Sequence, residues 1–290
     1  MGCLHAALFA EAGLSVVLLD HDPDRATAIR REGLRVTFPG TDQHTVKVPC
    51  TAEPLGLSAE LLLVFTKAYD TESALAFAAP AIGAQTTVLT LQNGLGNYET
   101  ISRQVGPDRV LAGSTSSGAT LTGVGEIRVA SIGEAVFGSP SGNRARAAEA
   151  AAFFEQAGLV ARLTDDVDAA LWRKAILNAA INPLGALTRR RNGELLEVPE
   201  LRALLGRVAT ESHAIALGLG LALEGLDPVA TVEQVCRDTA TNQCSMLQDV
   251  LAGRRTEIAQ INGEILRRAQ SAEIPAPLNE ALVALIEGVQ

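Results

Sequence analysis

The hydrophobic rhythm of the chain changes once, near residues 160–166, and this change constrains the fold more than any other feature. Before it, short and nearly continuous apolar runs alternate with segments of helical period, whereas only helical periods follow it. Short continuous apolar runs are typical of strands buried on both faces, as in a parallel sheet covered by helices. The sequence therefore predicts a doubly wound α/β domain over residues 1–163 and an all-α domain over residues 164–290.

Individual elements follow from the same patterns. The stretch GEIRVASIGEAVFG (125–138) alternates around Gly133 and predicts an antiparallel hairpin or an edge addition. An amphipathic helix is expected over 143–158, ended by Gly158. The first helix of the second domain is expected to open with Thr164 as its N-cap. Further helices are expected at 198–218, 228–238, 245–252, 255–270 and 277–287, and strands at 15–20, 60–67, 86–94 and 109–120.

The composition is that of an ordinary globular protein, with 47% hydrophobic and 20% charged residues among 290. A net charge of −9 disfavours a surface for nucleic acids or anionic membranes, and no apolar run reaches the ~18 residues of a membrane span. The four histidines are scattered, which argues against a metal site. We expect Cys3, Cys50, Cys236 and Cys244, which form no CxxC, to be buried thiols of a reducing, cytoplasmic protein.

The stretch LWRKAILNAAINPLGAL (171–187) places Lys174, Asn178 and Asn182 four residues apart, and we expect its helix to stop at Pro183. Four residues turn about 400° on an α-helix, so the three side chains line one narrow stripe among apolar neighbours. A solvated face normally carries longer, mixed charges, so this stripe is a candidate site. Lys174 is then either an exposed head on a buried stem or a perturbed, working amine.

Polar residues also end the predicted strands, at the edge of the sheet where open α/β folds bind ligands. Lys67 and Asn93 lie there, with a snorkelling lysine and an ordinary Asn-Gly turn as the simpler alternatives. Asp20 ends SVVLLD, where an acidic residue binds the adenosine ribose and disfavours a 2′-phosphate, or simply caps a turn. Arg25, one turn later, could instead receive a phosphate.

The beginning of the chain corresponds to the first helix and second strand of a Rossmann unit, without the strand and glycine turn that normally precede them. Gly2 is then the candidate third glycine of G-x-G-x-x-G, where a small residue lets helix and strand pack closely. We expect the strands at 15–20 and 60–67 to face a gap. We also expect the native protein to carry about ten more residues, an apolar strand and a glycine turn, without which dinucleotide binding is weak.

Two further candidates lie in the second half. Ser245 opens SMLQDVL, and because Ser-x-x-Gln is also a capping box, the N-cap is its simplest role. In GRRTEIAQINGEILRR, Ile258, Ile261 and Ile265 form a core stripe that Glu257 flanks. Most glutamates in such a position are solvated.

Four motifs together resemble the ketopantoate reductase (2-dehydropantoate 2-reductase) family, within the 6-phosphogluconate-dehydrogenase-like superfamily. They are FTKAYDTESAL, LQNGLGN, WRKAILNAAINPLGAL with NGELL, and SMLQDVLAGRRTEIAQINGEI, in the family's order over nearly the whole chain. The chain departs from the family pattern in its amino terminus, which looks truncated. It also departs at Ala259, where an acidic residue is expected, and at Asp20, because the family usually prefers NADPH.

The resemblance implies reduction of ketopantoate to (R)-pantoate with NADPH, a step of pantothenate and coenzyme A biosynthesis. Lys174 would be the general acid, and Glu257 would accept a hydrogen bond from the primary hydroxyl of the substrate. Asn178 and Asn182 would orient the substrate, and Ser245 would help to bind its carboxylate.

The resemblance also implies a Rossmann-type domain that binds NAD(P). Gly2, Asp20 and Arg25 are the candidate cofactor residues at its start, with NADH as the alternative to NADPH because of Asp20. Lys67 and Asn93 would line the cofactor and active-site rim from this domain. The stripe on the opposite helix would then be one wall of a cleft between two domains.

Two other functions stay open. One is an NAD(P)H-dependent reductase of another 2-oxo acid on the same scaffold, and the other is a non-catalytic, dinucleotide-binding or dimerising protein. The joint presence of the five candidate catalytic and substrate residues favours an enzyme. We expect its partner to be a small 2-oxo acid, with a homodimer as one alternative for its oligomeric state.

Overall fold

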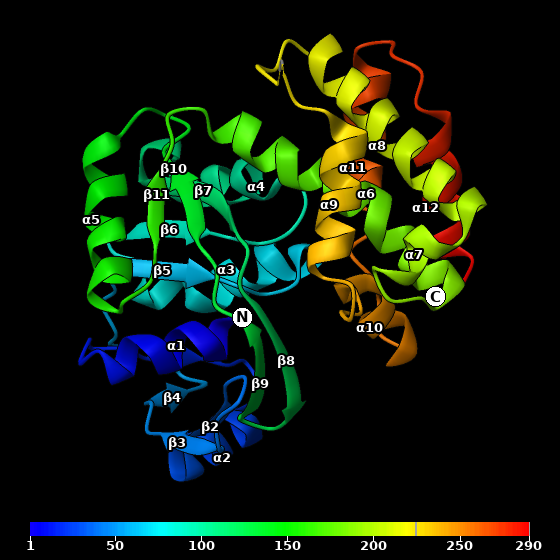
Figure 1. Ribbon diagram of the computed structural model, residues 1–290. Helices are drawn as coiled ribbons and strands as arrows, with labels where there is room; N and C mark the ends of the chain where they lie inside the picture. The colour runs from blue at the N-terminus through cyan, green and yellow to red at the C-terminus, as the bar shows by residue number, and fades with distance from the viewer. Residues whose placement is uncertain (224, 290) are drawn as a thin grey trace. The chain divides into compact units, whose positions relative to one another are not determined.

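The computed structural model describes residues 1–223 and 225–289, and the contacts within it divide the chain into two compact units (Figure 1). The α/β unit comprises residues 1–92 and 97–167. The helical unit comprises residues 93–96 together with the chain from residue 168 onward. The main change of unit thus lies close to the change of rhythm in the sequence.

A five-stranded sheet in the order β11-β10-β7-β6-β5 forms the centre of the α/β unit. Strands β5, β6 and β7 run parallel, β10 is antiparallel to β7, and β11 is parallel to β10. All residues of β6 are buried, as predicted for a strand covered on both faces. The strands are β5 (Leu61–Val64), β6 (Thr87–Thr90), β7 (Val110–Thr115), β10 (Ala135–Gly138) and β11 (Ala161–Leu163).

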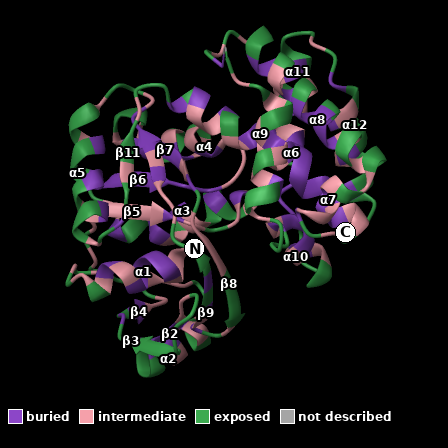
Figure 2. Cartoon of the chain, viewed as in Figure 1, coloured by how far each residue is buried: buried purple, intermediate pink, exposed green. Residues whose placement is uncertain are grey.

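Helices cover both faces of this sheet (Figure 2). Leu89 packs in a cluster with Phe9 and Phe154, which α1 and α5 contribute. Its neighbour Val88 points the other way and packs with Ile101, on the side of α3 and α4. This arrangement confirms the doubly wound architecture. The helices are α1 (Gly2–Glu11), α3 (Thr71–Ala78), α4 (Asn97–Val105) and α5 (Arg144–Gln156), with short 3-10 turns η1 (Ala68–Asp70), η2 (Ala79–Ala81) and η3 (Pro107–Arg109).

A second sheet in the order β3-β2-β9-β8 packs with α1 and α2 (Pro23–Glu32). Its members are β2 (Leu34–Thr37), β3 (His44–Val46), β8 (Gly118–Gly123) and β9 (Glu126–Ser131). A third, two-stranded sheet pairs β1 (Leu18–Leu19) with β4 (Cys50–Thr51) in parallel. Strand β5 is therefore an edge strand of its sheet, and β1 lies in another sheet.

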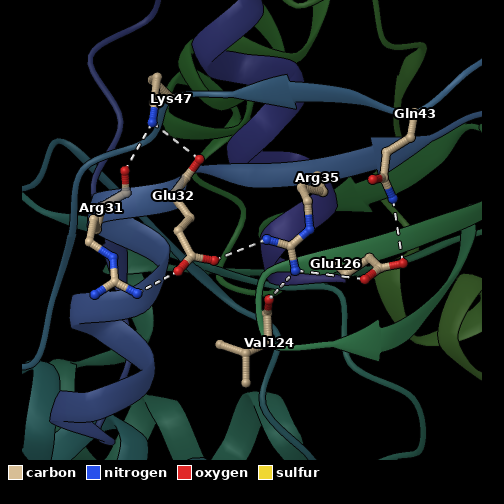
Figure 3. Close-up of polar contacts among 7 residues, drawn as sticks. All are labelled: Arg31, Glu32, Arg35, Gln43, Lys47, Val124 and Glu126. Carbon is tan, nitrogen blue, oxygen red and sulfur yellow. Dashed lines mark hydrogen bonds and ion pairs between the residues drawn. The ribbon is translucent and has the colours of Figure 1, made fainter.

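Exposed polar contacts join the end of α2 to the second sheet (Figure 3). Lys47 Nζ donates to the carbonyl oxygens of Arg31 and Glu32 at 3.0 and 3.1 Å. A cation at the carboxyl end of a helix is favourable because the helix dipole is negative there. Arg35 on β2 binds the Glu32 carboxylate at 3.2 Å and lies 3.6 Å from Glu126 on β9. Since these pairs are largely exposed, they contribute little to stability.

The pairing predicted for 109–138 is partly wrong. The stretch 109–120 forms two strands, β7 and β8, and β9 pairs with β8 whereas β10 pairs with β7. The tight turn lies at Gly125, where φ is +64°, and not at Gly133. Gly113 on β7 allows β10 to pair with β7. A Cβ at this position would lie 2.1 Å from the carbonyl oxygen of Val136, so only glycine lets β10 approach.

Seven helices build the described part of the helical unit, around a core that includes Trp172 and Ile176 of α6, Leu205 of α8 and Ile265 of α11. No helix among the described residues is long and apolar enough to cross a membrane. The helices are α6 (Val167–Thr188), α7 (Glu194–Glu197), α8 (Pro199–Gly218), α9 (Pro228–Asp238), α10 (Ser245–Leu251), α11 (Asn262–Ser271) and α12 (Pro277–Glu287).

Helix α6 differs from its prediction at both ends. Thr164 does not cap it, because its hydroxyl accepts from the Asp166 N–H in a separate turn and the helix begins at Val167. The helix also continues through Pro183 to Thr188. It ends where Arg189 adopts a left-handed conformation with φ +55°, and the Arg190 N–H donates to the carbonyl oxygen of Gly185.

The predicted helix at 255–270 is shorter than expected. Residues 257–261 form turns, and α11 begins only at Asn262. Ile258, Ile261 and Ile265 are nevertheless buried in the core, as predicted. Glu257 thus lies on a turn before the helix and not on a helical face.

Candidate active site

The three polar residues of the α6 stripe lie among buried apolar residues of the same helix. Lys174 and Asn178 are half-buried, and Asn182 is only 5% exposed. Ala175 and Ala179, which adjoin the stripe, are buried in the core. The stripe is therefore not a solvated helix face.

The structure brings Glu257 into the electrostatic neighbourhood of Lys174. Burial lowers the pKa of the Lys174 amine to about 8, and the Glu257 carboxylate acts in the opposite direction by stabilising the ammonium. Glu257 is only 5% exposed, and its carbonyl oxygen accepts from the N–H groups of Gln260 and Ile261. The result is a half-buried lysine whose amine has a pKa of about 8, beside a buried carboxylate, and perturbed pairs of this kind cluster at functional sites.

The loop at Asn93–Gly96 belongs to the helical unit, which differs from the expectation that Asn93 lies with the Rossmann-type domain. Leu95 is buried in the helical core, and its N–H donates to the carbonyl oxygen of Gln260 at 2.9 Å. A Cβ on Gly94, where φ is +83°, would lie 2.4 Å from the same oxygen. The loop with Asn93 thus packs directly on the turn that carries Glu257.

Ser245 is the first residue of α10, and its predicted role as N-cap is wrong by one position. Cys244 is the N-cap, with its sulfur accepting from the Leu247 N–H at 3.5 Å. Burial raises the pKa of Cys244 to about 11, so it stays a thiol at neutral pH. This thiol contacts the carbonyl oxygen of Asn182 at 3.5 Å and thereby ties Ser245 to the end of the stripe.

Sequence reasoning expected Cys244 only as a buried thiol and missed its role as the N-cap of α10. It also treated Cys3 as buried, whereas Cys3 is half-buried. The other three cysteines are buried, as expected, and all four are free thiols.

Asp20 and Arg25 meet just after β1 in the α/β unit. The Arg25 Nε and Nη2 atoms donate to the two Asp20 carboxylate oxygens at 3.1 and 2.6 Å. The Asp22 N–H also donates to Asp20, whose side chain is 18% exposed against 42% for Arg25. This ion pair engages Nε and Nη2 of the guanidinium, which leaves Nη1 as a further donor.

Gly2 and Lys67 lie near one another at the start of α1. The charge of Lys67 lowers the pKa of the Met1 amine, with burial as the larger cause. A Cβ on Gly2 would lie 3.7 Å from the Phe65 Cβ, which is ordinary contact, so this position has room for a small residue such as alanine as well as for glycine. A ten-residue helix amino terminus beside an ammonium suits a bound anion such as a dinucleotide pyrophosphate.

Sequence reasoning also missed Gln92, which is buried directly before Asn93. Its Nε2 donates to the carbonyl oxygen of Thr66 at 2.8 Å, and its Oε1 accepts from the Thr90 hydroxyl at 2.9 Å. Gln92 therefore fixes the carboxyl ends of β5 and β6 relative to each other. A long polar residue at the end of a fully buried strand was its only signal.

Two family models match the chain. The model described as ketopantoate reductase PanE/ApbA matches residues 1–142, and the one described as ketopantoate reductase PanE/ApbA C terminal matches residues 166–290. The chain belongs to the ketopantoate reductase family. It is thus an NAD(P)H-dependent oxidoreductase with a Rossmann-like α/β domain and a helical domain, as the sequence predicted.

Individual similar proteins and solved structures match nearly the whole chain. A curated protein of Halobacterium salinarum named 2-dehydropantoate 2-reductase is 36% identical over 100% of this chain and 96% of its own length. A solved 2-dehydropantoate 2-reductase from Geobacter metallireducens superposes with a TM-score of 0.92 at 29% identity, over 99% of this chain and 96% of that one. D-mandelate dehydrogenase with NADH and anilino(oxo)acetate superposes with a TM-score of 0.93 at 25% identity, over 99% and 94%.

Proposed function

We propose that this protein reduces ketopantoate to (R)-pantoate with NADPH, a step in the biosynthesis of pantothenate and coenzyme A. The observation that carries the proposal is the half-buried Lys174 amine, with its pKa near 8, beside the buried Glu257 carboxylate. The curated relatives named 2-dehydropantoate 2-reductase support the choice of substrate.

Lys174 has the central role in this mechanism. The nicotinamide, when bound, supplies a hydride to the carbonyl carbon of the substrate. As negative charge builds on the carbonyl oxygen, the Lys174 ammonium stabilises it and delivers a proton, so that hydride and proton together give the alcohol. Lys174 is left as a neutral amine and regains its proton from solvent. Its lowered pKa makes it a stronger acid than an ordinary lysine while keeping it largely protonated at neutral pH.

The remaining residues of the helical unit orient the substrate in this proposal. The amides of Asn178 and Asn182 hold the 2-oxo acid along the stripe, and the Ser245 hydroxyl binds its carboxylate. Glu257 accepts a hydrogen bond from the primary hydroxyl at the far end of ketopantoate. Asn93 would meet the bound molecules from the loop that packs on the Glu257 turn.

The α/β unit would hold the cofactor. The amino end of α1 at Gly2, together with Lys67, is suited to the pyrophosphate. Asp20 is placed to accept from the adenosine ribose, and Arg25 can donate from Nη1 to a 2′-phosphate without losing its pair with Asp20. Because that pair neutralises the Asp20 charge, the carboxylate repels the phosphate less than an isolated one would. We therefore propose NADPH as the preferred cofactor.

A second candidate function is reduction of another 2-oxo acid, which the likeness to D-mandelate dehydrogenase with NADH favours. Glu257 discriminates between the two functions, because 2-oxoisovalerate lacks the primary hydroxyl of ketopantoate. A site built to bind a hydroxyl can reject the analogue without it by about 10²-fold or more, since a buried acceptor is left unpaired.

The test is kcat/KM for ketopantoate, 2-oxoisovalerate and phenylglyoxylate with wild type and Glu257→Ala. We expect ketopantoate to be the best substrate by about 10²-fold, and Glu257→Ala to remove most of its advantage over 2-oxoisovalerate. Better turnover of phenylglyoxylate by the wild type would favour the second function. Equal losses for ketopantoate and 2-oxoisovalerate in the variant would show that Glu257 serves structure and not recognition.

A further inference from the structure

Pro183 creates an unmet hydrogen-bonding need in the middle of α6. In an α-helix, each carbonyl oxygen accepts from the N–H four residues later. The partner of Ala179 would be residue 183, and proline has no N–H. Because Ala179 is fully buried, water is a poor substitute, and a buried carbonyl without a donor destabilises the fold.

Asn262 supplies the donor from another helix. Its Nδ2 lies 3.0 Å from the Ala179 carbonyl oxygen, and its side chain is 0% exposed. Asn262 is the first residue of α11, directly after the turn that carries Glu257. A side-chain amide of α11 therefore takes the place of the missing main-chain N–H of α6.

A chain of buried hydrogen bonds fixes which way the Asn262 amide points. The Glu211 carboxylate accepts from the Asn279 N–H and from Asn279 Nδ2, both at 2.9 Å, and the Ser212 hydroxyl binds the same Nδ2 at 3.1 Å. A carboxylate only accepts, so the Asn279 oxygen must face the other way, toward Asn262 Nδ2 at 3.0 Å. The NH₂ group of Asn262 is then the end that faces two acceptors, Asn279 Oδ1 and the Ala179 carbonyl oxygen.

The hydrogen bond from Asn262 to Ala179 lies within the candidate active site. Ala179 directly follows Asn178 and precedes Asn182 by three residues, so the bond acts on the turn that sets Lys174 and Asn178 in line with Asn182. On the other side, the carbonyl oxygen of Glu257 accepts from the Ile261 N–H, one residue before Asn262. The single bond thus connects the helix of the proton donor to the turn of the hydroxyl acceptor.

We propose that Asn262 is a positioning residue for the reaction, which replaces the hydrogen bond lost at Pro183 and holds α6 against the turn of Glu257. This inference rests on the proposed function, because it takes Lys174 and Glu257 as the groups that need alignment. In this proposal, Pro183 frees the Ala179 carbonyl oxygen to accept a hydrogen bond from another helix.

The test is a double-mutant cycle between Asn262 and Pro183. Asn262→Leu keeps the size of the side chain but removes the donor, and Asn262→Ala is the milder form should the first fail to fold. Pro183→Ala restores a main-chain N–H that can donate to the Ala179 carbonyl oxygen. Ser212→Ala is the matched control, since it removes a bond of the same buried network but keeps the one to Ala179.

We expect Asn262→Leu to lower kcat by about 10- to 100-fold, with a smaller change in the KM for the 2-oxo acid, because alignment and not binding is lost. Pro183→Ala should recover most of this kcat in the double variant while leaving the wild-type rate nearly unchanged on its own. Ser212→Ala should lower the unfolding midpoint yet keep kcat close to wild type.

Rescue of both the unfolding midpoint and kcat supports the proposal. Rescue of the midpoint without kcat shows that Asn262 only stabilises the fold, and rescue of neither shows that the Ala179 carbonyl is not the relevant partner. These two outcomes overturn the proposal. Failure of the proposed function is a separate observation, namely a wild-type protein that is inactive on ketopantoate. In that case, the double-mutant cycle is measured by the unfolding midpoint and by turnover of whichever 2-oxo acid is the substrate.

Discussion

Two opposing effects act on the pKa of the Lys174 amine, and both can be measured. Burial lowers its pKa to about 8, and the Glu257 carboxylate counteracts part of that shift. A general acid must be protonated to act, so kcat/KM for reduction, which reports the pKa of the free enzyme, should fall as the pH rises through about 8. In Glu257→Gln the supporting negative charge is gone, the pKa of Lys174 falls further, and the alkaline limb should move to lower pH. The measurement is the pH profile of kcat/KM, and an alkaline limb that stays in place would show that Glu257 does not act on the charge of Lys174.

In the proposed function, Asp20 and Arg25 act in opposite directions on the choice between NADPH and NADH. Arg25→Ala removes the donor proposed for the 2′-phosphate and leaves Asp20 unpaired, so NADPH should lose about 10- to 100-fold in kcat/KM while NADH changes little. Asp20→Asn removes the repelling charge and should favour NADPH further. The measurement is kcat/KM for both cofactors. A strong wild-type preference for NADH that Asp20→Asn relieves would reverse the assignment.

At the scale of elements, the loop at Asn93–Gly96 offers a matched pair of glycines. Gly94 and Gly56 have φ of +83° and +84°, but a Cβ on Gly94 would lie 2.4 Å from the Gln260 carbonyl oxygen whereas Gly56 has nothing within 4 Å. Alanine at either position is strained by roughly 1–2 kcal/mol, and Gly94→Ala should add about 1–3 kcal/mol from the steric overlap. Urea unfolding measures this difference. Similar losses in the two variants would mean that the loop does not pack on the Glu257 turn.

The sequence predicted most long elements well and most short ones poorly. Helices α8, α9 and α12 were predicted within a residue or so, because each presents a long apolar period and carries a proline at its start. Strands β1 and β4 have two residues each, too few for any period to show. The pairing of β10 with β7 depends on the absence of a side chain at Gly113, a contact between distant segments that no local pattern reveals.

For the candidate site too, features set by a local pattern could be predicted and those set by distant contacts could not. The stripe of Lys174, Asn178 and Asn182 was visible because one regular helix sets its spacing. The continuation of that helix past Pro183 was not, because the compensating donor, Asn262, lies 83 residues away from Ala179 in sequence. Glu257 could not be recognised as buried from its local pattern, since its turn is defined by packing against the helical core.

At the scale of the whole molecule, the proposed chemistry divides between the two units. The groups proposed for the dinucleotide, Asp20, Arg25 and Lys67, belong to the α/β unit, and the proton donor and substrate residues belong to the helical unit. A variant in the helical unit should therefore abolish turnover while leaving cofactor affinity largely unchanged. Lys174 is suited to this test because the chain has only three lysines. The exposed Lys47, whose side chain contacts the carboxyl end of α2, serves as a matched control.

The most direct measurement is the rate of NADPH oxidation with ketopantoate by Lys174→Met and Lys47→Met, together with the Kd for NADPH from fluorescence titration. We predict that Lys174→Met lowers kcat by roughly 10²–10⁴-fold with an unchanged Kd, while Lys47→Met behaves like the wild type. Near-normal turnover by Lys174→Met, with the fold intact, would contradict the assignment of α6 as the catalytic helix.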